Sequence, residues 1–120
     1  MFLEGSDAAD ADWRAFEQLV AQHVADTNPG AIVEHDQHLP GRHSGVPRQV
    51  DVLARSEYEG QTVTAVYECK HYGRSVSLGT VEEFIGKLGD LAVDRGGLVR
   101  LRRNHGRGSA STLWCDAPQS

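Results

Sequence analysis

The chain has 120 residues, of which 39% are hydrophobic and 24% are charged. This length fits about one domain of ~100 to 150 residues, and the composition is that of an ordinary globular protein, which excludes collagen, a coiled coil and a fully disordered chain. No apolar stretch approaches the ~18 to 20 residues that a membrane helix needs. The acidic start also differs from a signal peptide, so we expect a cytoplasmic protein without a membrane partner.

Charge is distributed unevenly along the chain. The net charge of -5 argues against bulk coating of nucleic acid, which needs many basic contacts to phosphate. Residues 1–94 hold 16 acidic and 7 basic residues, whereas residues 95–120 hold five arginines and one acid, Asp116. We therefore predict an acidic leader over residues 1–9, a core domain over residues 10–101 and an irregular basic tail over residues 102–120. Two cysteines are too few for a disulfide framework, which favours reduced thiols.

The first predicted element is an amphipathic helix. Its apolar residues recur at spacings of three and four; they are Trp13, Phe16, Leu19, Val20 and Val24. The helix begins near residue 10 and ends at residues 28–30, where the sequence Asn-Pro-Gly stops it. A strand over residues 31–39 and a loop rich in glycine and proline follow.

The next stretch predicts a β-hairpin. Val50, Val52 and Ala54 alternate with Gln49, Asp51, Leu53 and Arg55, and a second alternating run ends at Lys70. If Glu59 and Gly60 form a two-residue turn, facing residues have numbers that sum to 119. Asp51 would then lie opposite Glu68, and Gln49 opposite Lys70, on one face of the hairpin.

A second helix is predicted over residues 81–94. Thr80 and Glu83 form a capping-box pattern, and Gly86 and Gly89 could let the helix lie close to a sheet. A short strand begins near Gly97 and should run parallel to the third strand, since a helical crossover joins them. The predicted fold is α/β, a mixed four-stranded sheet flanked by helices in the order αβββαβ.

Asp51, Glu68 and Lys70 are the residues that could carry chemistry. Two carboxylates from neighbouring strands would offer hard oxygen ligands to Mg2+, and a lysine beside them could orient a water and stabilise charge that develops on a phosphate. The same pattern of acids and lysine also occurs on the solvated face of any half-buried hairpin, so the alternation alone leaves both interpretations open.

The wider sequence context resembles a known family. Glu17 on the first helix, the VDV strand at residues 50–52 and the YECK strand at residues 67–70 resemble the PD-(D/E)xK, restriction-endonuclease-like superfamily, specifically its Mrr-type restriction endonuclease family. The similarity covers about residues 13–99. It implies that Asp51, Glu68 and Lys70 are catalytic, that Asp51, Glu68 and Glu17 hold Mg2+ or Mn2+, and that DNA is the substrate. The sequence after Val99 departs from the family pattern and suggests a truncated or out-of-frame C-terminal end.

Several other polar residues are candidates for weaker roles. Arg42, Arg48, Arg74 and Gln49 lie in or beside the loops near the carboxylates and could contact DNA, although each could equally be an ordinary surface residue. The arginines after residue 94 form a second basic patch or a solvated tail. His35, His38 and His43 do not have the spacing of a zinc site, because residues three apart on a strand point to opposite faces.

The leading functional interpretation is a metal-dependent DNA endonuclease that acts in Mrr-like restriction of foreign or modified DNA. A homodimer would provide two active sites for a double-strand cut. The alternative is a catalytically inactive, truncated nuclease-like fragment that binds nucleic acid or a protein partner, and a small metal-binding protein is a third, more remote interpretation.

Overall fold

The protein folds around one mixed sheet. The computed structural model describes residues 4–70, 76–104 and 107–116. Their elements, in chain order, are α1 (Glu4–Thr27), β1 (Ile32–Pro40), β2 (Pro47–Tyr58), β3 (Gln61–Lys70), α2 (Leu78–Asp90), β4 (Arg95–Asn104) and β5 (Arg107–Asp116). The strands form a five-stranded sheet in the order β1-β2-β3-β4-β5. The predicted α/β class and the parallel pairing of β3 with β4 are confirmed, while the sheet has one strand more than predicted.

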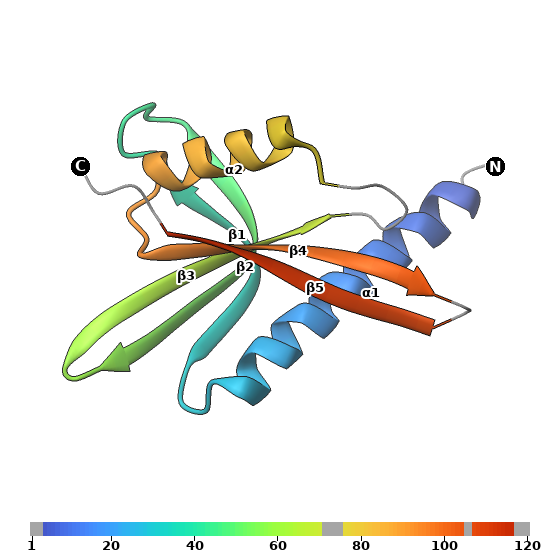
Figure 1. The fold of residues 1–120 in the computed structure, drawn as a ribbon, viewed down its shortest axis with the longest axis horizontal. Helices are drawn as coiled ribbons and strands as arrows, with labels where there is room; N and C mark the ends of the chain where they lie inside the picture. The colour runs from blue at the N-terminus through green and yellow to red at the C-terminus, as the bar shows by residue number, and fades with distance from the viewer. Residues whose placement is uncertain (1–3, 71–75, 105–106, 117–120) are drawn as a thin grey trace.

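The two helices lie on opposite sides of the sheet (Figure 1). On the α1 side, a core cluster joins Phe16, Val20 and Val24 to the sheet. On the α2 side, a second cluster joins Phe84 and Leu88 to residues of β2, β3 and β4. Because each fully buried aliphatic or aromatic side chain contributes about 1.5 to 3 kcal/mol, these two clusters hold the helices against the strands and fix the position of the carboxylate-bearing strand ends.

The β2–β3 hairpin has the predicted turn and register. Glu59 and Gly60 adopt φ values of 51° and 80°, and a two-residue turn with both φ values positive matches the right-handed twist of its strands. Tyr58 pairs with Gln61 at the turn, and the same register continues to Val52 and Tyr67. The residue numbers of these pairs sum to 119, so the predicted register is confirmed over this part of the hairpin.

Helix α2 begins earlier and ends earlier than predicted. Its N-cap is Ser77, whose hydroxyl accepts a hydrogen bond from the Thr80 N–H at 3.1 Å, so the predicted capping box of Thr80 and Glu83 is wrong. The helix ends at Asp90 instead of Asp94, because the loop between β1 and β2 binds its last turn.

The close approach of α2 to the sheet depends on a glycine of strand β4 and not on the glycine of the helix. A Cβ at Gly96 on β4 would lie 2.6 Å from Leu88 and 2.7 Å from Phe84, whereas a Cβ at Gly86 would meet nothing within 4 Å. The prediction that Gly86 brings the helix close to the sheet is therefore wrong.

Both ends of the described chain are more regular than predicted. The described part of the acidic leader, residues 4–9, belongs to α1, where Ala and acidic residues suit the first turns of a helix. The predicted irregular tail forms the end of β4 and the whole of β5, which pair in antiparallel fashion. Many of the residues after Leu101 are glycine, serine or arginine and show no hydrophobic period, so hydrogen bonding to a neighbouring strand decides their structure. Trp114 anchors β5, since its ring packs edge-on against Tyr67 with centroids 5.5 Å apart.

Candidate active site

The backbone is irregular where β2 carries Asp51. Val50 packs in the core cluster on the α2 side, whereas Val52 packs in the cluster on the α1 side. Residues two apart in a regular strand point the same way, so the expectation that Val50 and Val52 share a face is wrong. The β1–β2 register pairs His35 with Val52 and Gln37 with Val50 but skips the position between them, where Asp36 has a φ of 53°, in the left-handed region. This local irregularity rotates the strand and redirects the Asp51 side chain, as irregular strand positions near functional sites often do.

Asp51 links β2 to the end of β3 through its side chain. The backbone ladder between the two strands ends at Val52 and Tyr67. Beyond that pair, the Cys69 N–H donates a hydrogen bond of 2.7 Å to Asp51 Oδ2, and Gln49 Nε2 donates one of 3.1 Å to Asp51 Oδ1. The carboxylate of Asp51 is therefore held next to the residue that follows Glu68 in the chain.

Glu17 on α1 approaches Asp51 from the helix side. It is a buried charged residue, with 7% of its surface exposed. The pKa of Glu17 is raised from 4.5 to about 7, first by burial and then by its hydrogen bond with Asp51 and by the negative charges of Asp51 and Asp36. In the absence of a cation, the Glu17 carboxyl group therefore keeps its proton up to near-neutral pH, beside Asp51. A divalent cation would compensate the same accumulation of negative charge.

Glu68 lies between two ammonium groups. Lys87 Nζ on α2 contacts Glu68 Oε1, and Lys70 Nζ lies 3.5 Å from Glu68 Oε2. The Glu68 and Lys87 side chains are 13% and 17% exposed, so this ion pair is largely removed from solvent. The structure therefore brings Glu68 and Lys70 together as the sequence pattern suggested, and it adds a second lysine from a helix.

The predicted metal ligands form two neighbouring groups. Glu17 and Asp51 form one, Glu68 with its lysines forms the other, and the backbone of Cys69 connects them. Among the described residues, no group of three or more acidic, histidine or cysteine side chains is arranged to hold a metal ion. The donor chemistry nevertheless fits Mg2+, which usually binds one or two carboxylates, several waters and a substrate phosphate. Asp51 and Glu17 are such a carboxylate pair, with Glu68 adjacent.

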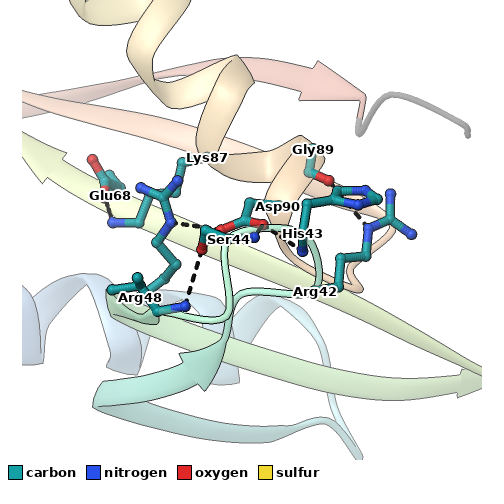
Figure 2. Close-up of polar contacts among 9 residues, drawn as sticks. Arg42, His43, Ser44, Arg48, Glu68, Lys87, Gly89 and Asp90 are labelled. Atoms are coloured by element: carbon teal, nitrogen blue, oxygen red, sulfur yellow. Dashed lines mark hydrogen bonds and ion pairs between the residues drawn. The ribbon is translucent and has the colours of Figure 1, made fainter.

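Two of the predicted DNA-contacting arginines take part in a structural network. Asp90, at the end of α2, accepts hydrogen bonds from the Ser44 hydroxyl at 2.6 Å and from the His43 and Ser44 N–H groups. Arg48 Nε donates to Asp90 at 2.9 Å, and Arg42 Nε donates to the Gly89 carbonyl. Figure 2 shows the β1–β2 loop wrapped around this carboxylate. The Ser44 and Arg48 hydrogen bonds, with those of the backbone, hold the pKa of Asp90 well below its usual range.

The other two predicted DNA contacts have different outcomes. Gln49 Nε2 lies 3.3 Å from Asp36 Oδ1 and also donates to Asp51, so Gln49 supports the acidic group. Arg74 lies outside the described residues.

Two cavities lie on opposite sides of the sheet. The larger, about 740 Å³, lies between α1 and the sheet and is lined mainly by apolar residues that include Phe16, Tyr67 and Trp114. None of the predicted site residues within the described part of the chain lines it. The smaller, about 460 Å³, is called the α2 cavity below; it is lined by Arg48, Glu68, Lys70, Thr80, Glu83, Phe84, Gly86 and Lys87. The α2 cavity therefore holds two of the three predicted catalytic residues.

Lys87 and Asp90 belong to the site but were not predicted from the sequence. The chain has only two lysines, Lys70 and Lys87, and both contact Glu68. Lys87 directly precedes the buried Leu88 on α2. A lysine at the edge of the apolar stripe of a helix can extend its side chain along the packed surface, and this position could have indicated its role. For Asp90 the sequence offered no comparable signal, because its partners are more than 40 residues away.

The fold and the site define a class of protein. A mixed sheet with α1 and α2 on opposite faces, and a D…ExK set where β2 and β3 separate, are features of restriction-endonuclease-like domains. The family model Mrr_cat, described as restriction endonuclease, matches residues 8–105. The chain belongs to this family. No curated protein and no solved structure matches the chain in the corresponding searches.

Within the described residues, neither helix is long and apolar enough to cross a membrane.

Proposed function

We propose that the protein is a DNA endonuclease that hydrolyses phosphodiester bonds with Mg2+ or Mn2+, in restriction of foreign or modified DNA. Membership of a restriction endonuclease family supports the reaction class and the DNA substrate. The metal dependence is proposed from the Glu17 and Asp51 carboxyl pair and from Glu68, which lies next to the Cys69 backbone that binds Asp51.

Each polar residue of the site has a role in this proposal. Asp51 and Glu17 would hold the metal ion through their carboxylate oxygens, and Glu68 would complete the site when its carboxylate turns away from Lys87. A bound divalent ion supplies positive charge that acidifies a water and polarises the phosphate. Lys70, whose Nζ lies 3.5 Å from Glu68 Oε2, would orient the attacking water and stabilise the charge that develops on the phosphate oxygens.

One observation carries the proposal. The Cys69 N–H donates to Asp51 Oδ2 at 2.7 Å, in place of a backbone bond to β2. This hydrogen bond joins the Asp of one strand to the ExK segment of the next at the point where their ladder stops. A solvated hairpin face would not require a buried Glu17 beside Asp51, and it would not require Glu68 to be largely buried.

The proposal is tested by incubating the protein with supercoiled plasmid DNA and Mg2+ or Mn2+. Wild-type protein should produce nicked or linear plasmid, and EDTA should prevent the reaction. Asp51→Ala and Lys70→Ala should each abolish cleavage, whereas Arg55→Ala should not, because Arg55 is exposed and pairs with Glu34 outside the site. Plasmid binding without metal-dependent cleavage would favour the inactive nucleic-acid-binding alternative, and cleavage that survives Asp51→Ala would reject the proposed ligand.

A further inference from the structure

We propose that the α2 cavity is a subsite for a backbone phosphate of DNA and that Lys87 is the residue that binds this phosphate. The inference rests on the proposed function only in that DNA is taken as the ligand. It assigns a role to a helix residue outside the D…ExK pattern.

The cavity presents two ammonium groups to an anion. Among the described residues that line it, Arg48, Lys70 and Lys87 are cationic and Glu68 and Glu83 are acidic. Arg48 is already paired with Asp90, so Lys70 and Lys87 are the cations that a ligand would meet. The Lys87 side chain is only 17% exposed. Because the attraction between charges is stronger where water is partly excluded, an anion that enters this cavity gains more from Lys87 than from an arginine on the open surface.

The cavity also has room for a phosphate group. Its volume of about 460 Å³ lies within the range of small-ligand sites, ~300 to 1,000 Å³. Gly86 lies on its wall, one residue before Lys87, and a Cβ at Gly86 would meet nothing within 4 Å. No side chain from this position therefore fills the space beside Lys87.

The contact with Glu68 places the Lys87 ammonium at the boundary between the catalytic group and the cavity. An ammonium has three N–H donors, and the Glu68 carboxylate occupies only part of this capacity. Lys87 can therefore bind Glu68 and a phosphate together. Figure 2 shows Glu68 and Lys87 beside Arg48, which reaches toward them from the start of β2. A phosphate held here would lie directly next to Lys70, and this would align the DNA strand with the proposed catalytic residues.

The test is the salt dependence of DNA binding, measured without metal. A fluorescein-labelled DNA duplex is titrated with protein in EDTA at several NaCl concentrations, and binding is followed by anisotropy. Each phosphate contact contributes about 0.9 to the slope of log K against log salt. Lys87→Met should lower the slope by about 0.9 and weaken binding at low salt about fivefold, whereas Lys87→Arg should retain most of the slope.

Two controls keep the result interpretable. Arg55→Met removes the same unit of charge at the exposed Glu34 pair and should leave the slope unchanged. Lys87→Met leaves Glu68 without one of its partners, so Glu68→Gln with and without Lys87→Met is compared as a second pair, and the same loss of slope is expected. Competition with free inorganic phosphate at millimolar concentration should displace little duplex, since it offers one contact instead of a strand.

The outcomes separate this subsite from the proposed function. Equal slopes for Lys87→Met and Arg55→Met, or for the two Glu68→Gln variants, would overturn the subsite even if the protein cleaves plasmid. A reduced slope in a protein that never cleaves DNA with metal would support the subsite and reject the nuclease.

Discussion

Glu17→Gln should stabilise the metal-free protein at alkaline pH. The folded pKa of Glu17 is raised from 4.5 to about 7, chiefly by burial and then by Asp51. For a carboxyl whose folded pKa is raised, the protonated form is favoured by folding, so stability is fully present below pH 4.5 and is lost as the pH rises through about 7. Above that pH the folded protein holds a buried, ionised Glu17 beside Asp51, and a neutral glutamine removes both the buried charge and the repulsion.

The magnitude follows from the same pKa values. A rise from 4.5 to about 7, at ~1.36 kcal/mol for each pH unit, corresponds to about 3 kcal/mol at pH 8.5 and to less than about 1 kcal/mol at pH 5. For a domain of this size, about 3 kcal/mol shifts the melting temperature by roughly 10 °C. The assay is thermal and urea unfolding of wild type and Glu17→Gln in EDTA at both pH values, with Glu82→Gln, the same change at an exposed position, as a control.

Added metal should reverse the effect. Since a ligand that binds only the folded state stabilises it, millimolar Mn2+ at pH 8.5 should raise the melting temperature of wild type more than that of Glu17→Gln. A Glu17→Gln variant that is no more stable than wild type at pH 8.5 in EDTA would refute the interpretation of Glu17 and Asp51 as a strained carboxyl pair.

Two further predictions concern the α2 side. Asp90→Asn should destabilise the protein at neutral pH, because Asp90 accepts hydrogen bonds from Arg48 and from the β1–β2 loop. The Asp90 pKa is lowered in the folded state, so the difference between wild type and Asp90→Asn in urea unfolding should be constant above about pH 5 and shrink as the pH falls below ~4; a difference that grows in acid would contradict this. Gly86→Ala should stabilise α2 by about 1 kcal/mol, since its methyl meets nothing, whereas Gly96→Ala should destabilise by about 1 to 3 kcal/mol because its methyl would collide with Leu88. Similar unfolding midpoints for the two alanine variants would disprove the close-approach explanation.

Local sequence signals predicted the hairpin well. The two-residue turn of Glu59 and Gly60 determines the register of β2 and β3, because a short turn leaves few geometric options. The helical crossover that follows determines that β4 runs parallel to β3. The same reasoning failed at Val50, where a regular period of two was assumed across Asp51. The irregularity there depends on Asp36 of another strand, which no local pattern reveals.

The rest of the site depends on contacts between distant segments. Strand β5 forms by pairing with β4, and its Gly- and Ser-rich start carries no period to predict. Lys87 becomes a partner of Glu68 only because Gly96 lets α2 lie close to the sheet. The residue types of the D…ExK set were therefore readable from the sequence, whereas their ionic partners were set by packing.

The most direct test of the metal site is a titration of the metal-free protein with Mn2+, followed by electron paramagnetic resonance. Asp51→Asn is compared with Asp36→Asn, which removes a nearby carboxylate of the same charge that is not assigned as a ligand. We expect wild type to bind Mn2+, Asp51→Asn to bind at least about tenfold more weakly, and Asp36→Asn to change the affinity by less than about threefold. Equal Mn2+ affinity for wild type and Asp51→Asn would contradict the assignment of a metal ion to this site.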